Sequence, residues 1–152
     1  MIFRLFVLAL AIWTGGGVFQ TLTDHSGWHA DPVGWVRGYS VRSGSANPWP
    51  LTTAIAGLTT LATLGAFARY RGPGRRTVWI STAGALLVLL ATGLYFVPRL
   101  GTIFGQTATL TDAQIIAYSN QWILLNAIRL VVLLALLYTA LVGLGQMCQR
   151  RA

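Results

Sequence analysis

The 152-residue chain is 55% apolar and only 9% charged, whereas soluble domains have about a quarter charged residues. This balance excludes an ordinary soluble domain and indicates one small membrane domain. The formal charge of +8 comes from eleven arginines against three aspartates. Because most arginines flank apolar segments, they indicate topology and contact with membrane lipid, and nucleic acid is not an expected partner.

Four segments are apolar and long enough to cross a bilayer, since a hydrocarbon core about 30 Å thick takes roughly 20 helical residues. In chain order, these spans cover residues 2–22, 49–70, 77–98 and 122–145. Two outer loops are expected at 23–48 and 99–121, while a tight glycine- and proline-rich turn joins the second and third spans. The predicted fold class is therefore an all-α membrane protein, an up-down bundle of four transmembrane helices.

The distribution of arginines predicts which side the loops face. With the N-terminus inside, seven arginines lie in the cytoplasm and three lie outside, together with all three aspartates. The cytoplasmic set is Arg4, Arg69, Arg71, Arg75, Arg76, Arg150 and Arg151. We therefore expect a multi-pass plasma membrane protein of the bacterial inner membrane, with both termini in the cytoplasm.

The first outer loop opens with "TLTDHSGWHADP", which holds both histidines and two of the three acids of the chain. These are His25, His29, Asp24 and Asp31. If the segment were helical, the four-residue spacing would align both histidines as metal ligands, and the aspartates could complete the set. Gly27 weakens such a helix, so a general-base role and a solvated loop are the alternatives. No cofactor is required by the sequence, and a metal at the histidines is the one candidate.

The fourth span carries polar residues at membrane depth. At 100° per residue, Trp122, Asn126 and Arg129 share one face, which continues inward through Leu133 and Leu136. A charge at this depth costs at least a few kcal/mol unless it is paired or hydrated, so it must face the bundle interior or a water-filled cavity.

The other spans also place polar or aromatic residues in the outer half, whereas their inner halves are almost entirely aliphatic. Trp13 and Gln20 share a face of the first span, Thr52 and Thr53 lie near the start of the second, and Tyr95 lies near the end of the third. We expect an amphipathic pocket that opens to the outer face. Alternatively, Arg129 and Asn126 lock the helices together, while Tyr95 and Trp122 are membrane-interface residues.

Two sequences in the second half of the chain, "TGLYFVPRLGTIFG" and "NQWILLNAIRLVVLLALL", resemble the anthrone-oxygenase-like family of small four-helix membrane proteins. Tyr95 and Pro98 match an aromatic-proline stretch that closes the third helix. Trp122, Asn126 and Arg129 match a Trp-x3-Asn-x2-Arg pattern that opens the fourth. The resemblance covers roughly the last 60 residues, and it implies oxidation of the central methylene of a tricyclic anthrone to a ketone by molecular oxygen.

On this interpretation, a lipophilic phenolic substrate lies against Trp122 and Tyr95, with Gln20 and Trp13 as further binding residues. Arg129 and Asn126 would stabilise the developing enolate oxygen. His25 or His29 would remove the methylene proton as the general base.

A second hypothesis makes the chain a non-catalytic accessory subunit of a larger membrane protein complex. Small-residue patches such as "GGG" at residues 15–17 support close helix contacts with a membrane-protein partner or with a second copy of the chain. A transporter is disfavoured because the inner half has no polar lining.

Overall fold

The computed structural model describes the backbone of residues 1–38 and 49–149, and the side chains of these residues except 24–26 and 49. Within these residues all regular secondary structure is helical. The elements are α1 (Ile2–Ala30), α2 (Pro32–Arg37), α4 (Trp49–Phe67), α5 (Arg75–Ala91), the π-helix η1 (Thr92–Phe96), α6 (Val97–Gly105) and α7 (Asp112–Cys148). Since α5, η1 and α6 are continuous, the described chain contains four helices long and apolar enough to cross a membrane, which confirms the predicted fold class.

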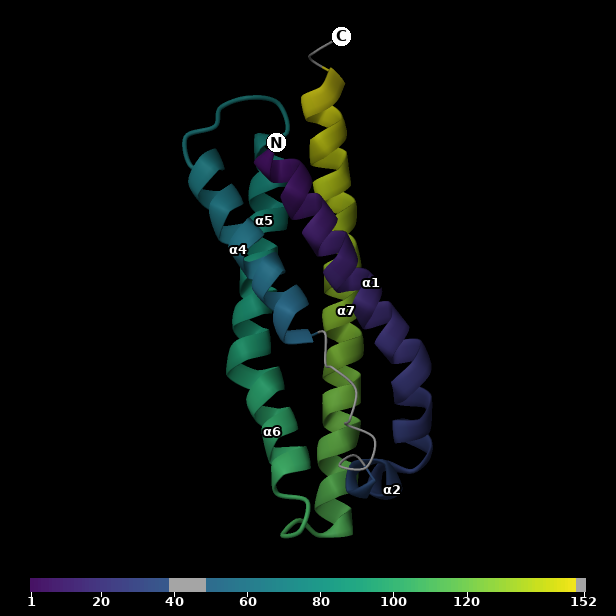
Figure 1. The fold of residues 1–152 in the computed structure, drawn as a ribbon. Coiled ribbons are helices and arrows are strands. Elements are labelled where there is room, and N and C mark those ends of the chain that lie inside the picture. The colour runs from purple at the N-terminus through teal and green to yellow at the C-terminus, as the bar shows by residue number, and fades with distance from the viewer. Residues whose placement is uncertain (39–48, 150–152) are drawn as a thin grey trace.

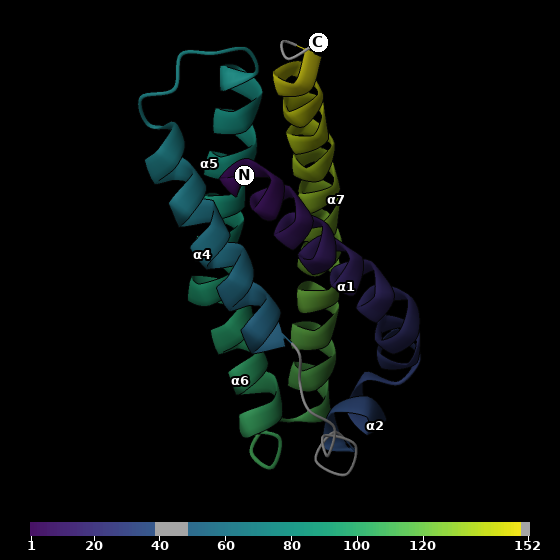
Figure 2. The same ribbon diagram turned by 45° about the horizontal axis from the view of Figure 1, so that its top comes forward.

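The four long helices run up and down in a bundle (Figure 1). The start of α1, the link between α4 and α5 and the end of α7 lie at one end, while α2 and the turn between α6 and α7 lie at the other, and Figure 2 shows the same arrangement from a second angle. This is the arrangement that the arginine pattern requires. Arg42, Arg150 and Arg151 lie outside the described residues, and the side of the membrane that each end faces stays a prediction.

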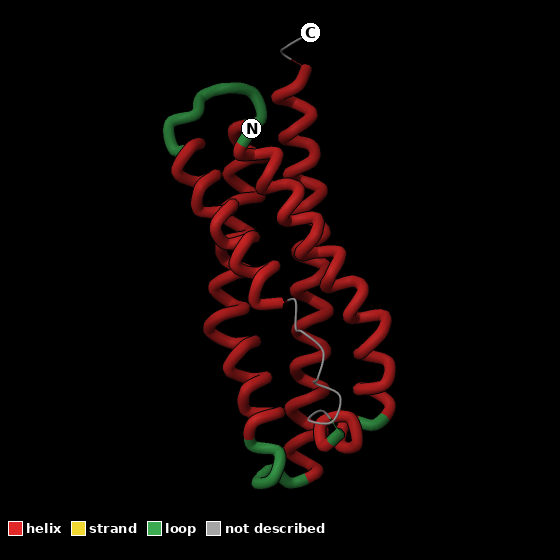
Figure 3. The backbone as a smooth tube through the Cα atoms, in the orientation of Figure 1, coloured by secondary structure: helices red, strands yellow, loops and turns green. Residues whose placement is uncertain are grey.

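Three of the four long helices extend farther than the predicted spans (Figure 3), whereas α4 ends at Phe67, short of the predicted 49–70. Helix α1 continues to Ala30, the third long helix to Gly105, and α7 begins at Asp112. Much of the two predicted outer loops, 23–48 and 99–121, is therefore helical, although residues 39–48 lie outside the described part.

Local contacts explain these helix boundaries. Thr111 and Gln114 form the capping box that starts α7. Helix α1 continues through Gly27 because the absent side chain makes room for Trp35 of α2, whose ring would lie 3.0 Å from an added Cβ atom. Asp31 then caps α2 by accepting a hydrogen bond of 2.9 Å from the Gly34 N–H.

Buried apolar side chains form two clusters along the bundle. The inner cluster joins α1, α4, α5 and α7 and includes Leu133 and Leu136, as the stripe on the fourth span predicts. The outer cluster gathers residues of α1, α2, η1, α6 and α7, namely Trp28, Val36, Phe96, Ile103, Ile115 and Trp122.

Helix lengths place the outer cluster near or beyond the membrane boundary. The 19 residues of α4 span about 28 Å, close to one hydrocarbon core, whereas the 37 residues of α7 span about 55 Å. Along the exposed face of α7, the polar residues Asn120 and Gln121 are followed by Leu124 and Ile128. We infer that α1, α6 and α7 project beyond the hydrocarbon as a small head, while α4 begins at the boundary.

The inner half is less aliphatic than expected. Four buried hydroxyl residues lie there, Thr60, Thr63, Ser81 and Thr82. Each hydroxyl donates a hydrogen bond to a carbonyl three or four residues earlier in its own helix, so these residues are satisfied without a partner helix. Their burial was not predicted from the sequence, because a threonine or serine counts as polar in a hydropathy pattern. Once its hydroxyl bonds to a carbonyl of its own helix, the residue can be buried among apolar side chains.

The inner ends of α5 and α7 pack closely at Gly143, where an added Cβ atom would lie 2.7 Å from the Thr77 Oγ1 atom. This oxygen also contacts the Gln146 Oε1 atom at 3.2 Å, which limits its freedom to move. We predict that Gly143→Ala lowers the free energy of unfolding by about 1–3 kcal/mol, since it overpacks the interface.

Gly145 is the matched control, because an added Cβ atom there has no neighbour within 4 Å. Gly145→Ala should leave stability unchanged or raise it by up to about 1 kcal/mol through helix propensity. Unfolding in detergent, followed by circular dichroism, measures both variants, and an equal effect of the two would contradict the packing described here.

Candidate functional site

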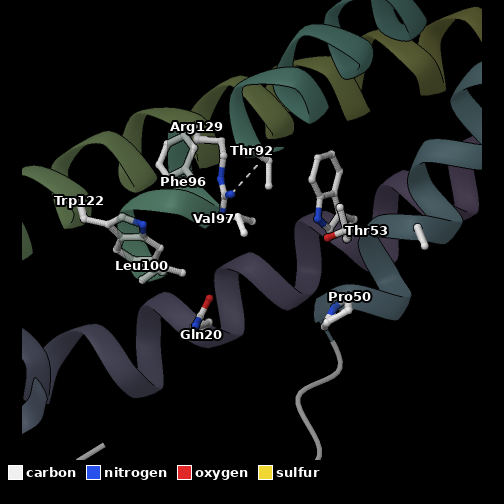
Figure 4. A pocket seen from close by; sticks show the side chains of 11 residues that line it. Gln20, Pro50, Thr53, Thr92, Phe96, Val97, Leu100, Trp122 and Arg129 are labelled. Atoms are coloured by element: carbon white, nitrogen blue, oxygen red, sulfur yellow. Dashed lines mark hydrogen bonds between the residues drawn. The ribbon is translucent and has the colours of Figure 1, made fainter. Parts of the chain in front are cut away.

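A cavity of about 540 Å³ lies between α1, α4, the η1–α6 segment and α7 (Figure 4). It is at the level where α4 begins, and therefore at the outer boundary of the inferred hydrocarbon region. The lining residues come from all four long helices: Trp13, Gln20, Pro50, Thr53, Ala54, Thr92, Phe96, Val97, Leu100, Trp122 and Arg129. The predicted convergence of the four spans in one half of the bundle is thus present as a cavity.

The cavity wall formed by the third long helix depends on the π-helix η1. Pro98 has no N–H group, and its ring would clash with a carbonyl in the preceding turn of a regular α-helix. The helix widens just before this proline, and the Val97 N–H donates to the carbonyl of Thr92, five residues earlier. Such π turns are frequent at functional sites. Here the turn directs Thr92, Phe96 and Val97 together toward the cavity.

Arg129 supplies the only charged side chain among the described lining residues. Its Nη1 group donates to the Thr92 Oγ1 atom at 3.4 Å, which is long for a hydrogen bond. Its Cζ atom lies 4.6 Å from the centroid of the Phe96 ring, in cation–π geometry. Within the described residues, the buried Nε atom has no hydrogen-bond partner. The guanidinium is therefore held against η1 while part of its donor capacity is unused.

The acids of the chain do not neutralise this charge within the described part. Asp31 caps α2, and Asp112 forms an exposed ion pair with Arg37. The side chain of Asp24 lies outside the described residues.

Aromatic rings form the outer wall. Trp122 stacks on Trp28 with a centroid distance of 5.0 Å, and its other neighbour, Phe96, meets it edge to face at 6.1 Å. Because Trp28 and Phe96 belong to the outer cluster, the cavity wall is continuous with the packed head. The position of Trp122 is thereby fixed from two sides.

Four of the predicted site residues line the cavity, namely Trp13, Gln20, Trp122 and Arg129. Tyr95 does not, because its ring packs edge-on against Phe96 at 5.3 Å and its hydroxyl is buried with no partner among the described residues. Asn126 is only 2% exposed and does not line the cavity either. The predicted pairing of Asn126 with Arg129 on one ligand therefore lacks support in the geometry.

The histidine segment is helical, since residues 25–29 belong to α1. His29 is exposed and lies outside the cavity lining. The side chains of His25 and Asp24 lie outside the described residues, and Asp31 is occupied as a helix cap. Among the side chains that the structure describes, no three histidine, cysteine or acidic residues gather as metal ligands.

A second outer arginine, Arg99, belongs to a different environment. Its Nη2 group donates to the Gln121 Oε1 atom at 2.7 Å, and its Cζ atom lies 3.8 Å from the centroid of the Tyr118 ring. Arg99 thus fastens α6 to α7 and does not line the cavity. It is the natural control for experiments on Arg129.

Sequence reasoning missed the lining residues of the third long helix. Thr92, Phe96 and Leu100 recur every four residues, which is the signal that could have identified this face. Tyr95, one position away from Phe96, was predicted instead, because it is the polar aromatic residue near the end of the third span and it also fits the family pattern.

Comparison of the chain with protein-family models, with curated proteins and with solved structures gave no match.

The contact between Arg129 and Thr92 predicts an energetic coupling between α7 and η1. In a double-mutant cycle of Thr92→Val and Arg129→Gln, we expect a coupling of about 0.5–1.5 kcal/mol, the range of polar contacts between membrane helices. Unfolding of the purified protein in detergent gives the four free energies.

The cycle of Thr92→Val with Arg99→Gln serves as the control, and its two effects should add within about 0.5 kcal/mol. Additive effects for Arg129 as well would show that the guanidinium is not held by η1.

Proposed function

We propose that the protein binds a compact lipophilic molecule in this cavity and that an oxygen atom of the molecule accepts hydrogen bonds from Arg129. The observation that carries the proposal is a partly buried guanidinium, with unused donor capacity, at the wall of an otherwise largely apolar cavity. Small-molecule sites of about 300–1,000 Å³ commonly combine apolar walls with few polar groups, and a volume of about 540 Å³ falls within this range.

The depth of the charge favours a ring compound over a phospholipid. Along α7, the backbone of Arg129 lies about two helical turns, roughly 10 Å, farther from the head than that of Trp122. A phospholipid keeps its headgroup at the interface. To place its phosphate against Arg129, it would have to enter the cavity headgroup first and leave its acyl chains pointing toward the water. A compact molecule with an oxygen at its leading edge meets Arg129 and contacts Trp13 and Trp122 with its apolar surface.

The family resemblance adds a reaction to this binding proposal. In the anthrone-oxygenase-like reaction, a methylene group and molecular oxygen give a ketone and water. The substrate loses a proton to form an enolate, oxygen takes two electrons from the carbon and forms the new carbon–oxygen bond, and loss of water completes the ketone. Arg129 would stabilise the negative oxygen of the enolate.

The positions of the described side chains leave few candidates for the group that accepts the proton in this reaction. No histidine or carboxylate is among the described lining residues, and His29 is exposed outside the cavity. His25 or a solvent base would then take the proton. Neither Asn126 nor Tyr95 has a direct role in this version of the reaction, because neither lines the cavity.

We predict that Arg129→Gln lowers kcat/KM for the oxygen-dependent conversion of anthrone to anthraquinone by at least about 100-fold, as loss of an oxyanion-stabilising donor does. The measurement uses purified protein in detergent under air and under nitrogen. Arg99→Gln removes the same charge from a neighbouring site and should keep native activity.

Two outcomes separate this proposal from the accessory-subunit alternative. If the purified chain alone oxidises anthrone no faster than empty micelles but binds it, the reaction is wrong and the binding proposal stands. If it neither binds nor reacts, and one larger assembly always accompanies it in mild detergent, the accessory role is favoured.

A further inference from the structure

Resting on the proposed function, we infer that the cavity takes its ligand as an anion. An acidic phenol or enol binds as the phenolate or enolate, with its negative oxygen against Arg129. A neutral ether or ketone of the same shape binds more weakly. The inference names the charge state of the ligand, which the proposed function leaves open.

The charge of the described cavity wall is the first argument. Arg129 is its only charged side chain, and the groups that face it from the other helices are uncharged: Trp13, Gln20, Thr53, Thr92 and Phe96. Two of the three acids in the chain are engaged at the far side of the head, as a helix cap and in a surface ion pair. Because the guanidinium lies in a region of low dielectric constant, an anionic ligand gains more from it than it would in water.

Hydrogen bonding is the second argument. A guanidinium has five N–H donors and no acceptor, and Arg129 uses one of them in a long contact with Thr92. The Thr92 hydroxyl donates its own proton to the Val88 carbonyl at 2.7 Å, so it accepts from Arg129 and has nothing left to donate. Next to Arg129, a ligand oxygen therefore meets donors.

A neutral phenol fits this corner poorly, because its own O–H group needs an acceptor. Of the two acceptor lone pairs of the Thr92 oxygen, one is already used by Arg129, and the Phe96 ring is covered by the guanidinium. The Gln20 amide lies across the cavity from Arg129 (Figure 4). A phenolate has no proton to place and accepts from the Nη–H groups of Arg129 that Thr92 does not occupy, through a charge-assisted bond that is stronger than a neutral one.

The test uses 4-nitro-1-naphthol, whose visible absorption changes on ionisation, and its methyl ether, which has the same rings and cannot ionise. Binding of either compound to the protein in non-ionic detergent is followed by quenching of tryptophan fluorescence, since Trp13 and Trp122 line the cavity. A pH titration of the bound naphthol, read from its absorption, gives its pKa. The same titration in empty micelles gives the reference.

We expect the native protein to lower the pKa of the bound naphthol by at least about one unit, as a nearby arginine does for a carboxyl group. Above that pKa, the naphtholate should bind at least about tenfold more tightly than the ether. Arg129→Gln should remove the pKa shift and make the two affinities equal, while Arg129→Lys should keep part of the shift. Arg99→Gln should behave like the native protein.

Three other outcomes would contradict the inference. If naphthol and ether bind the native protein equally, with no pKa shift, the ligand is taken as a neutral molecule and the inference is wrong, while the proposed binding function stands. If neither compound binds, the proposed function fails and the inference fails with it. A shift that survives in Arg129→Gln, checked as folded by circular dichroism, would assign the anion to another group and overturn the inference.

Discussion

A positive charge within the hydrocarbon region of a membrane is costly unless it faces the bundle interior or a water-filled cavity. Arg129 imposes this constraint on the whole outer half of the bundle. Its guanidinium lies against Thr92 and the ring of Phe96, on the π-helical turn that precedes Pro98. Pro98 thus favours the π-helical turn against which the guanidinium packs. The cost of leaving this charge in an apolar environment explains why polar and aromatic residues of every long helix meet at this level.

The cavity beside Arg129 follows from unequal helix lengths. Helix α4 is 19 residues long and begins at the boundary, while α1, α6 and α7 continue beyond it into the packed head. The first turns of α4 therefore contribute Pro50 and Thr53 to the cavity wall. The head holds Trp122 in place through Trp28, which fixes the position of the outer wall.

Hydropathy and helical periodicity were sufficient to predict the four spans and the buried stripe of α7, because both depend on average burial. The capping box at Thr111 and Gln114 also has a local sequence signature, because the two residues are three positions apart at the start of the helix. The extensions of α1 and α6 were not predicted. They depend on contacts between distant segments, such as Trp35 against Gly27, which no local pattern encodes.

The candidate site was predicted in part, for a related physical reason. Arg129, Trp122, Gln20 and Trp13 could be placed because a polar or aromatic residue on an apolar helix has one favourable direction. Phe96 was missed in favour of Tyr95, since a π turn changes the helical phase by about one residue and hydropathy carries no sign of it. Asn126 shows the limit of a helical wheel, because residues on one broad face can be buried without reaching the cavity.

The most direct test of the central claim is the water accessibility of position 129. In a Cys148→Ser background, Arg129→Cys and Ile128→Cys would be treated with a charged, membrane-impermeant thiol reagent added from the outer side. Ile128 is 52% exposed on the outer surface of the bundle and should face lipid. With position 129 facing a cavity that opens to the outer side, as the sequence predicts, we expect rapid labelling at 129 and negligible labelling at 128. Equal labelling of the two positions, or labelling of 128 alone, would contradict an inward-facing guanidinium at a cavity open to the outer side.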